Sequence, residues 1–273
     1  MKLLNGSGSW PLEAEVVIAV PSIHLNMVKD NARSGIMYIT FIIITIVIVI
    51  YLDINVCAQD VAYNEKFGAY TGELSASLLV DSGIKWTLTG HSERRVGFGG
   101  QGESSKQVAI KTKNALAANM SVILCIGEML SDRESGKTMD VCIEQLSACT
   151  AVLTHEEWKR VVIAYEPVWA IGTGKVATPA QAEETHFHIR QWIEKNVSPK
   201  VASEIRIIYG GSVKGSNCAE LITCPNIDGF LVGGASLLPE FIDIIKVKYY
   251  TIQTIILLLI KYINSVHTNK RTN

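Results

Sequence analysis

The stretch of this chain that decides its fold reads AYEPVWAIGTGK over residues 164–175. Before it, residues 161–163 form an apolar run that is too short for a helix and predicts a buried strand. Pro167 ends that strand, because proline cannot donate to a sheet ladder. After it, residues 178–181 (TPAQ) form a capping box with proline at the first helical position, which predicts a helix start. Glu166 is therefore predicted at the carboxyl end of a buried strand, followed by a loop and a helix.

The loop after this strand has the composition of a lid. Pro167 and Trp169 stiffen its start, and Gly172 and Gly174 lie near its far end. Such a loop can close over a bound molecule by turning about a few hinge residues. The alternative is an ordinary strand-to-helix loop with a solvent-facing glutamate, and composition alone does not choose between the two.

Apolar runs and helical segments alternate along most of the chain. This alternation indicates a parallel sheet built of βα units. Seven units are counted, whereas a closed (β/α)8 barrel requires eight. The predicted strands are 15–20, 54–58, 86–89, 122–125, 161–165, 205–209 and 229–232. The predicted helices are 22–30, 74–81, 104–119, 138–153, 179–196, 216–223 and 239–248.

The composition bounds the class of protein. A chain of 273 residues is long enough for one large α/β domain with a sizeable core. The net charge of −1 implies no polyanionic partner such as nucleic acid. The six cysteines form no C-x-x-C pair and join no histidine cluster, which indicates buried, reduced thiols and no metal site.

Three more motifs follow predicted strands. GHSERR (residues 90–95) comes directly after the strand that ends at Thr89. A histidine in such a place is, by itself, more often structural than catalytic. YGGSV (209–213) and VGGAS (232–236) end the last two strands. Glycines let backbone N–H groups approach a phosphate closely, and a phosphate site after the last two strands is usual in (β/α)8 barrels.

Together these motifs resemble the triosephosphate isomerase family, over about residues 15–30 and 54–246. The resemblance implies an α/β fold, a TIM (β/α)8 barrel. It implies that glyceraldehyde 3-phosphate and dihydroxyacetone phosphate are interconverted by proton transfer through an enediolate, in glycolysis and gluconeogenesis. It also implies a small phosphorylated triose as substrate, no cofactor, no metal, no nucleic acid partner, a cytoplasmic location and a homodimer.

The resemblance assigns roles to two catalytic residues. Moving a proton between adjacent carbons requires a base at the C–H bond and a donor at the carbonyl oxygen. Carried over by motif, Glu166 is the base and His91 is the donor. This family is itself a standard example of such a site, in which a helix N-terminus lowers the pKa of the histidine and keeps it neutral.

The same resemblance assigns the remaining site residues. Glu93 is implied to support the site as a second carboxylate, although a surface ion pair with a neighbouring arginine is the alternative. Thr71 is implied at the tip of a loop that enters the partner subunit, and Asp60 stands where the family has asparagine, which predicts a charge in the interface. The residues implied to hold the substrate phosphate are Gly172, Ser212, Gly233 and Gly234.

The resemblance to the family does not extend to the two ends of the chain. The family opens with a strand that carries an asparagine and a lysine, followed by a helix, and neither element is visible here. Lys2 is the only lysine that could stand in. The barrel is therefore predicted to be incomplete, with its first βα unit missing or replaced. We expect one domain over 1–248, interrupted by an apolar insert at 34–53, and an extra C-terminal tail at 249–273 that is surface-docked or disordered.

The insert contains an uncharged stretch of Ile and Val at residues 35–52. Its length is borderline for a membrane span. An anchor is disfavoured against an aggregation-prone strand and against translated non-coding sequence. Three functions therefore remain: an isomerase, a catalytically impaired or inactive barrel that acts as an interaction protein or is a defective gene product, and a membrane-anchored barrel.

Overall fold

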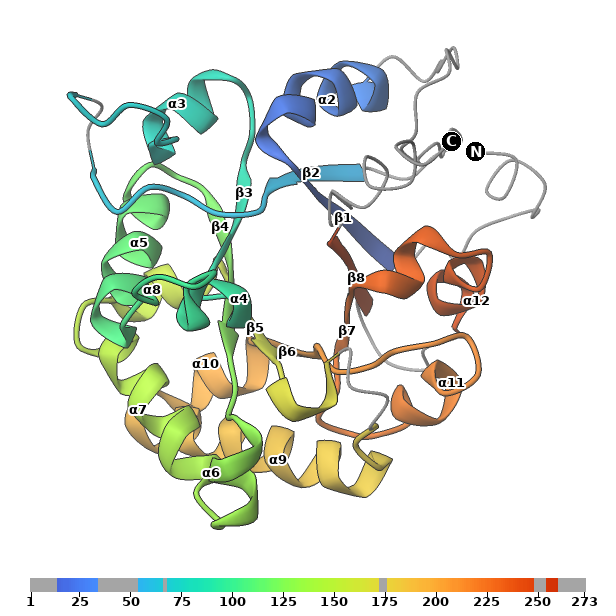
Figure 1. Cartoon of the computed structure of the whole chain (residues 1–273). Helices are drawn as coiled ribbons and strands as arrows, with labels where there is room; N and C mark the ends of the chain where they lie inside the picture. Colours follow the sequence, from blue (N-terminus) through green and yellow to red (C-terminus); the bar gives the residue numbers. More distant parts are fainter. Residues whose placement is uncertain (1–13, 34–53, 66–67, 172–175, 248–253, 260–273) are drawn as a thin grey trace.

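Eight parallel strands form a closed barrel. The computed structural model describes residues 14–33, 54–65, 68–171, 176–247 and 254–259. The strands follow one another around the ring in chain order (Figure 1). They are β1 (Ala14–Val20), β2 (Ile54–Ala58), β3 (Trp86–Thr89), β4 (Ser121–Ile126), β5 (Val161–Tyr165), β6 (Arg206–Tyr209), β7 (Gly229–Val232) and β8 (Thr254–Leu259).

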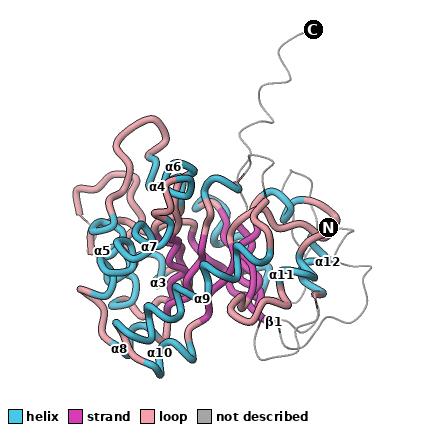
Figure 2. The backbone as a smooth tube through the Cα atoms, turned by 90° about the horizontal axis from the view of Figure 1, so that it is seen from below, coloured by secondary structure: helices cyan, strands magenta, loops and turns pink. Residues whose placement is uncertain are grey.

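The helices lie outside this ring of strands, as Figure 2 shows from below the view of Figure 1. Capping boxes at Ser104, Thr154 and Thr178 start three of them, each by accepting from the backbone three residues later. The helices are η1 (Ser22–His24), α2 (Leu25–Arg33), α3 (Ala76–Asp81), α4 (Ser92–Val96), α5 (Ser105–Ala117), α6 (Leu130–Glu134), α7 (Thr138–Thr150), α8 (His155–Trp158), η2 (Val168–Ala170), α9 (Pro179–Asn196), α10 (Pro199–Glu204), α11 (Cys218–Leu221), η3 (Gly234–Leu237) and α12 (Phe241–Lys246).

The core has two layers because successive strand residues point to opposite faces. On β1, Val17 and Ala19 belong to a cluster inside the ring, whereas Val16 and Ile18 belong to the layer between strands and helices. Both layers are closed to solvent, so the strands read as continuous apolar runs. The seven strands predicted from the sequence are confirmed, with ends that differ by one residue at most.

The eighth strand corrects one expectation and explains the missing unit. We expected residues 249–273 to form a tail outside the barrel, and this is wrong for Thr254–Leu259. This segment pairs in parallel with β7 on one side and with β1 on the other. The first βα unit is thus replaced: a strand from the C-terminal end of the chain closes the ring. A closed ring has no unpaired strand edge, which is the physical reason for this placement.

An ion pair also ties the two sides of this closure together. The Glu15 carboxylate on β1 accepts from Arg206 Nη1 on β6 at 2.7 Å and from Asn55 Nδ2 on β2 at 2.9 Å. Because β7 and β8 lie between β6 and β1 in the ring, the ion pair reaches across the barrel near the amino ends of the strands. It holds β1 and β6 at a spacing that leaves room for two strands.

Several expectations fall on residues outside the described ranges. These are the insert at 34–53, Lys2, and Gly172 on the lid. Within the described ranges, no helix is long and apolar enough to cross a membrane. All six cysteines are buried and unpaired, as expected.

Candidate active site

Glu166 lies at the carboxyl end of β5 and is almost fully buried, with 2 % of its surface exposed. Its backbone N–H donates to Ile126 O on β4 at 2.7 Å. Its two carboxylate oxygens have different partners: Oε1 lies 3.0 Å from His91 Nε2, and Oε2 accepts from Ser92 N at 3.0 Å. The base and the electrophile predicted from the sequence therefore meet in the fold, as expected from parallel strands whose carboxyl ends share one end of the barrel.

The protonation pattern of His91 follows from its position at the start of α4. His91 is the N-cap of this helix, and its Nδ1 accepts from Glu93 N at 3.3 Å. A ring nitrogen that accepts a hydrogen bond carries no proton, so the neutral ring carries its proton on Nε2. The Nε2–H group points at the Glu166 carboxylate. It is the donor that a carbonyl oxygen would meet when a substrate enters.

Glu93 contributes to this site chiefly through its main chain. Its carboxylate lies 3.8 Å from His91 Nδ1, which is beyond hydrogen-bond distance, and its side chain is 44 % exposed. The backbone N–H of Glu93 makes the contact with the imidazole. The support predicted from the Glu93 carboxylate stays a prediction.

Two glycines allow the neighbouring strands to close on Glu166. Gly127 has φ of +157°, and a Cβ there would overlap the Glu166 backbone oxygen. A Cβ on Gly210 would lie 3.0 Å from Glu166 Cγ. These residues follow β4 and β6, on either side of β5. Their lack of side chains keeps the carboxylate in one narrow position between them.

The start of the lid is fixed by a buried carboxylate that follows β4. Glu128 is fully buried and accepts from Trp169 Nε1 at 2.9 Å and from the Tyr165 hydroxyl at 3.1 Å. Its backbone oxygen accepts from Val168 N at 3.1 Å. Burial raises the pKa of Glu128, while these donors and Arg133 oppose the rise. Residues 168–170 are thereby anchored to the loop after the adjacent strand.

We expect Trp169→Phe to lower kcat/KM by about 10-fold or more. The substitution keeps the aromatic ring but removes a hydrogen bond to a charged group, which contributes about 1.5–3 kcal/mol. Kinetics and thermal melting of Trp169→Phe would be compared with Trp192→Phe on the outer helix α9. Equal activity of the two variants would show that the contact between Trp169 and Glu128 does not position the lid for the reaction.

The loops after β6 and β7 hold the residues predicted to bind phosphate. Ser212 donates its hydroxyl to Ala170 O at 2.6 Å, which joins the loop after β6 to the start of the lid. A Cβ on Gly233 or Gly234 would meet no heavy atom of the described residues within 4 Å, so the described part of the chain leaves space beside their backbone. Gly234 begins η3. These three lie at the same end of the barrel as Glu166, whereas Gly172 lies outside the described residues.

Three further residues were missed by sequence reasoning: Ser92, Glu128 and Arg95. Ser92 acts through its backbone N–H, which no side-chain pattern reveals. Glu128 stands within the motif CIGE (residues 125–128), but its burial under Trp169 depends on how two loops pack. Arg95 was visible only as one of two adjacent arginines.

The fold and the site define a class of protein: a (β/α)8 barrel with a buried carboxylate–imidazole pair at the carboxyl ends of its strands, the end at which enzymes of this fold have their active sites. The sequence profile of the triosephosphate isomerase family matches residues 4–248. Similar proteins include triosephosphate isomerases of Coprinopsis cinerea (49% identical over 234 residues; 86% of this chain, 84% of that protein) and Taenia solium (48% over 236; 86% and 86%). A third, from Oryza sativa subsp. japonica, carries the name "Triosephosphate isomerase, cytosolic" (49% over 247; 90% and 88%). The chain belongs to the triosephosphate isomerase family.

Proposed function

We propose that this chain interconverts glyceraldehyde 3-phosphate and dihydroxyacetone phosphate with Glu166 as base and His91 as electrophile. Glu166 removes the proton from C2 of the aldehyde, and the electron pair forms the enediolate. His91 Nε2–H stabilises the developing oxygen charge. The same carboxyl group returns a proton to C1, so one C–H bond breaks and another forms. The hydroxyl proton moves from the C2 oxygen to the C1 oxygen through the His91 imidazole, which gives a proton to one oxygen and takes one from the other, and the carbonyl thereby moves from C1 to C2.

One observation carries this proposal above the others. The Nε2 atom of His91 and the Oε1 atom of Glu166 lie 3.0 Å apart in a buried position, with Nδ1 occupied by a backbone N–H. A base and a neutral donor at this spacing can act on two neighbouring atoms of one small molecule. The neutral imidazole suits an enediolate, because donor and intermediate are close in proton affinity.

The phosphate of the substrate is proposed to lie over the loops after β6 and β7. Ser212 and the backbone of Gly233 and Gly234 border open space at that end of the barrel. Gly172 of the lid is proposed as a fourth contact by its match to the family pattern. Backbone N–H groups in glycine-rich loops are suited to anions because no side chain blocks their approach.

The proposed rate is lower than a complete site would give. Among the described residues that line the cavities at His91 and Glu166, none is a lysine. Loss of one oxyanion-stabilising donor costs on the order of 10²–10³ in rate in other enzymes. Lys2 lies outside the described residues, and so does Lys261, the second residue after β8. Because β8 is parallel to β1, its carboxyl end lies at the same end of the barrel as Glu166.

A coupled isomerase assay on the purified full chain tests this function. We expect slow turnover that depends on Glu166. The Lys2→Ala and Lys261→Ala variants run beside it, and a further loss in one of them identifies the cation that completes the site. Absence of any turnover in the wild-type chain would contradict the proposal and favour the inactive-barrel alternative.

The cytoplasm is proposed as the location of this chain. The relative from Oryza sativa is named a cytosolic enzyme, and it is 49% identical over 90% of this chain. This proposal requires that residues 35–52, which lie outside the described ranges, do not anchor the chain in a membrane.

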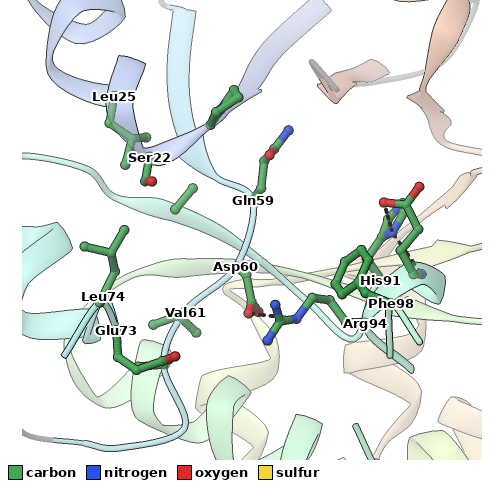
Figure 3. A pocket seen from close by; sticks show the side chains of 15 residues that line it. Ser22, Leu25, Gln59, Asp60, Val61, Glu73, Leu74, His91, Arg94 and Phe98 are labelled. Carbon is green, nitrogen blue, oxygen red and sulfur yellow. Dashed lines mark hydrogen bonds and ion pairs between the residues drawn. The ribbon is translucent and has the colours of Figure 1, made fainter. Parts of the chain in front are cut away.

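A homodimer is proposed, with a second copy covering the face around Thr71 and α4. A cavity of about 370 Å³ opens there beside His91 and is bordered by Asp60, Arg94 and Phe98 (Figure 3). Phe98, which borders this cavity, is 72% exposed. Large apolar side chains next to a cavity are typical of a protein interface.

The charge at Asp60 is balanced inside the protomer. Asp60 Oδ2 lies 2.6 Å from Lys111 Nζ and 3.1 Å from Arg94 Nε. Burial raises the pKa of Asp60, and Lys111 opposes the rise. Two buried oxygens of the cluster, Asp60 Oδ1 and Glu103 Oε2, have no hydrogen-bond partner in the described part of the chain. Because buried polar atoms are normally satisfied, these oxygens favour a donor from a second copy.

We expect Phe98→Lys to weaken dimer formation by about 30-fold or more, as the loss of an aromatic interface anchor does in other complexes. Sedimentation at low micromolar concentration measures the change. Phe187→Lys is the matched control, because Phe187 is 43% exposed on the outer helix α9. Identical sedimentation of the two variants would place the interface elsewhere.

A further inference from the structure

The side chain and main chain of Arg95 hold both peptide units that flank His91. Its Nε donates to Gly90 O at 2.8 Å, on the peptide before His91. Its backbone N–H donates to His91 O at 3.1 Å, on the peptide after His91. That second peptide also contains the Ser92 N–H that donates to Glu166 Oε2 at 3.0 Å. Arg95 therefore fixes the two groups that contact the Glu166 carboxylate.

The same guanidinium group also connects the ends of two strands. Its Nη2 donates to Cys125 O on β4 at 3.0 Å, while Gly90 directly follows β3. Gly90 has φ of +69°, and a Cβ there would lie 2.7 Å from Arg95 Nη2. The absence of a side chain at Gly90 thus lets the guanidinium approach the backbone. A planar fork of donors fixes the geometry of two carbonyls at once, and a lysine ammonium lacks this fork.

The charge of Arg95 has no direct counterion. Its hydrogen bonds go to two carbonyl oxygens and to the Ser105 hydroxyl at 3.4 Å, and no carboxylate lies within 4.0 Å of it among the described residues. Arg95 and Glu166 line the same cavity of about 150 Å³. Burial lowers the pKa of Arg95, and the Glu166 carboxylate opposes this change. An arginine stays charged even so, and its position is set by the carbonyl and hydroxyl oxygens that it contacts.

We propose that Arg95 is a positioning residue for the reaction, which orients His91 and Ser92 toward Glu166. This inference rests on the proposed role of Glu166 as base. It adds a requirement that the base and the imidazole alone do not express: a guanidinium group that holds the peptides on both sides of His91.

The test compares Arg95→Met and Arg95→Gln, which remove the positive charge and the fork, with Arg95→Lys, which keeps the charge but not the planar fork. The first readout is independent of activity: the NMR signals of the His91 imidazole nitrogens, assigned by their loss in His91→Gln. The second readout is kcat and KM measured separately. Arg160→Met is the matched control, because Arg160 also donates to a backbone carbonyl, Met120 O at 3.0 Å, at the opposite end of β5.

We expect all three variants to move the His91 signals and to lower kcat by about 10-fold or more with a smaller change in KM, because each loses the fork that orients the loop. Arg160→Met should change neither readout. Unmoved His91 signals or an unchanged kcat in Arg95→Met and Arg95→Gln would overturn the proposal. If the wild-type chain shows no turnover, the proposed function fails, and the His91 signals alone decide whether Arg95 orients the imidazole.

Discussion

The Ile256→Pro substitution is expected to lower the free energy of unfolding by about 2–4 kcal/mol, because proline removes a ladder hydrogen bond and leaves a buried acceptor unpaired. Ile256 is paired with Val16 on one side and Phe230 on the other, so it lies in the interior of the sheet. Domains of this kind have only about 5–15 kcal/mol of stability in total. The variant should therefore melt well below the wild type or fail to accumulate as folded protein.

The control for this variant is Ser265→Pro, which introduces the same residue beyond the end of β8. Thermal melting followed by circular dichroism measures both. We expect the control to melt with the wild type. If Ile256→Pro also melts at the wild-type temperature, the segment 254–259 does not close the barrel. The edges of β7 and β1 must then be covered in another way.

The second large effect is expected at the base. Glu166→Gln should lower kcat by about 10²–10⁴, the usual contribution of a positioned general base. Glutamine keeps the size of the side chain and an oxygen that can accept from Ser92 N, so the loss reports proton transfer more than folding. Glu93→Gln is the comparison, because its carboxylate is 44 % exposed and 3.8 Å from the imidazole. We expect it to lower kcat by less than about 10-fold. A comparable loss in the two variants would contradict the assignment of the base.

Local sequence patterns predicted much of the barrel because its strands are short, apolar and bounded by clear signals. The run VVI before Glu166 and the capping box at Thr178 were enough to place β5 and α9. The meeting of Glu166 and His91 followed from topology alone, since parallel strands bring their carboxyl ends to one end of the barrel.

The closure by β8 could not be read in the same way. The run TIILLL (residues 254–259) has the composition of a strand, but its neighbours in the ring are determined by which edges remain unpaired. The Glu15–Arg206 ion pair, formed between residues 191 positions apart, is a similar case. Such long-range partners depend on the whole ring, and local patterns carry no information about them.

Arg95 and Glu128 were missed for a related reason. Arg95 binds backbone carbonyls, and Glu128 accepts from side chains of β5 and the lid. The role of each residue follows from these hydrogen-bond partners and not from its amino-acid type. Arg94 and Arg95 are adjacent in sequence, yet Arg94 binds the carboxylates of Asp60 and Glu103, and Arg95 binds backbone carbonyls. Only the direction of each side chain from α4 separates these roles.

The central claim is that Glu166 moves a proton between adjacent carbons of a triose phosphate, and the measurement that tests it most directly is isomerisation in D₂O followed by NMR. Starting from glyceraldehyde 3-phosphate, the wild-type full chain is expected to form dihydroxyacetone phosphate with deuterium at C1, because a proton held by a carboxylate exchanges with solvent before it is returned. Glu166→Gln should form this product at a rate lower by about 10²–10⁴. Product without deuterium, or the same deuterated product at the same rate from Glu166→Gln, would contradict the account.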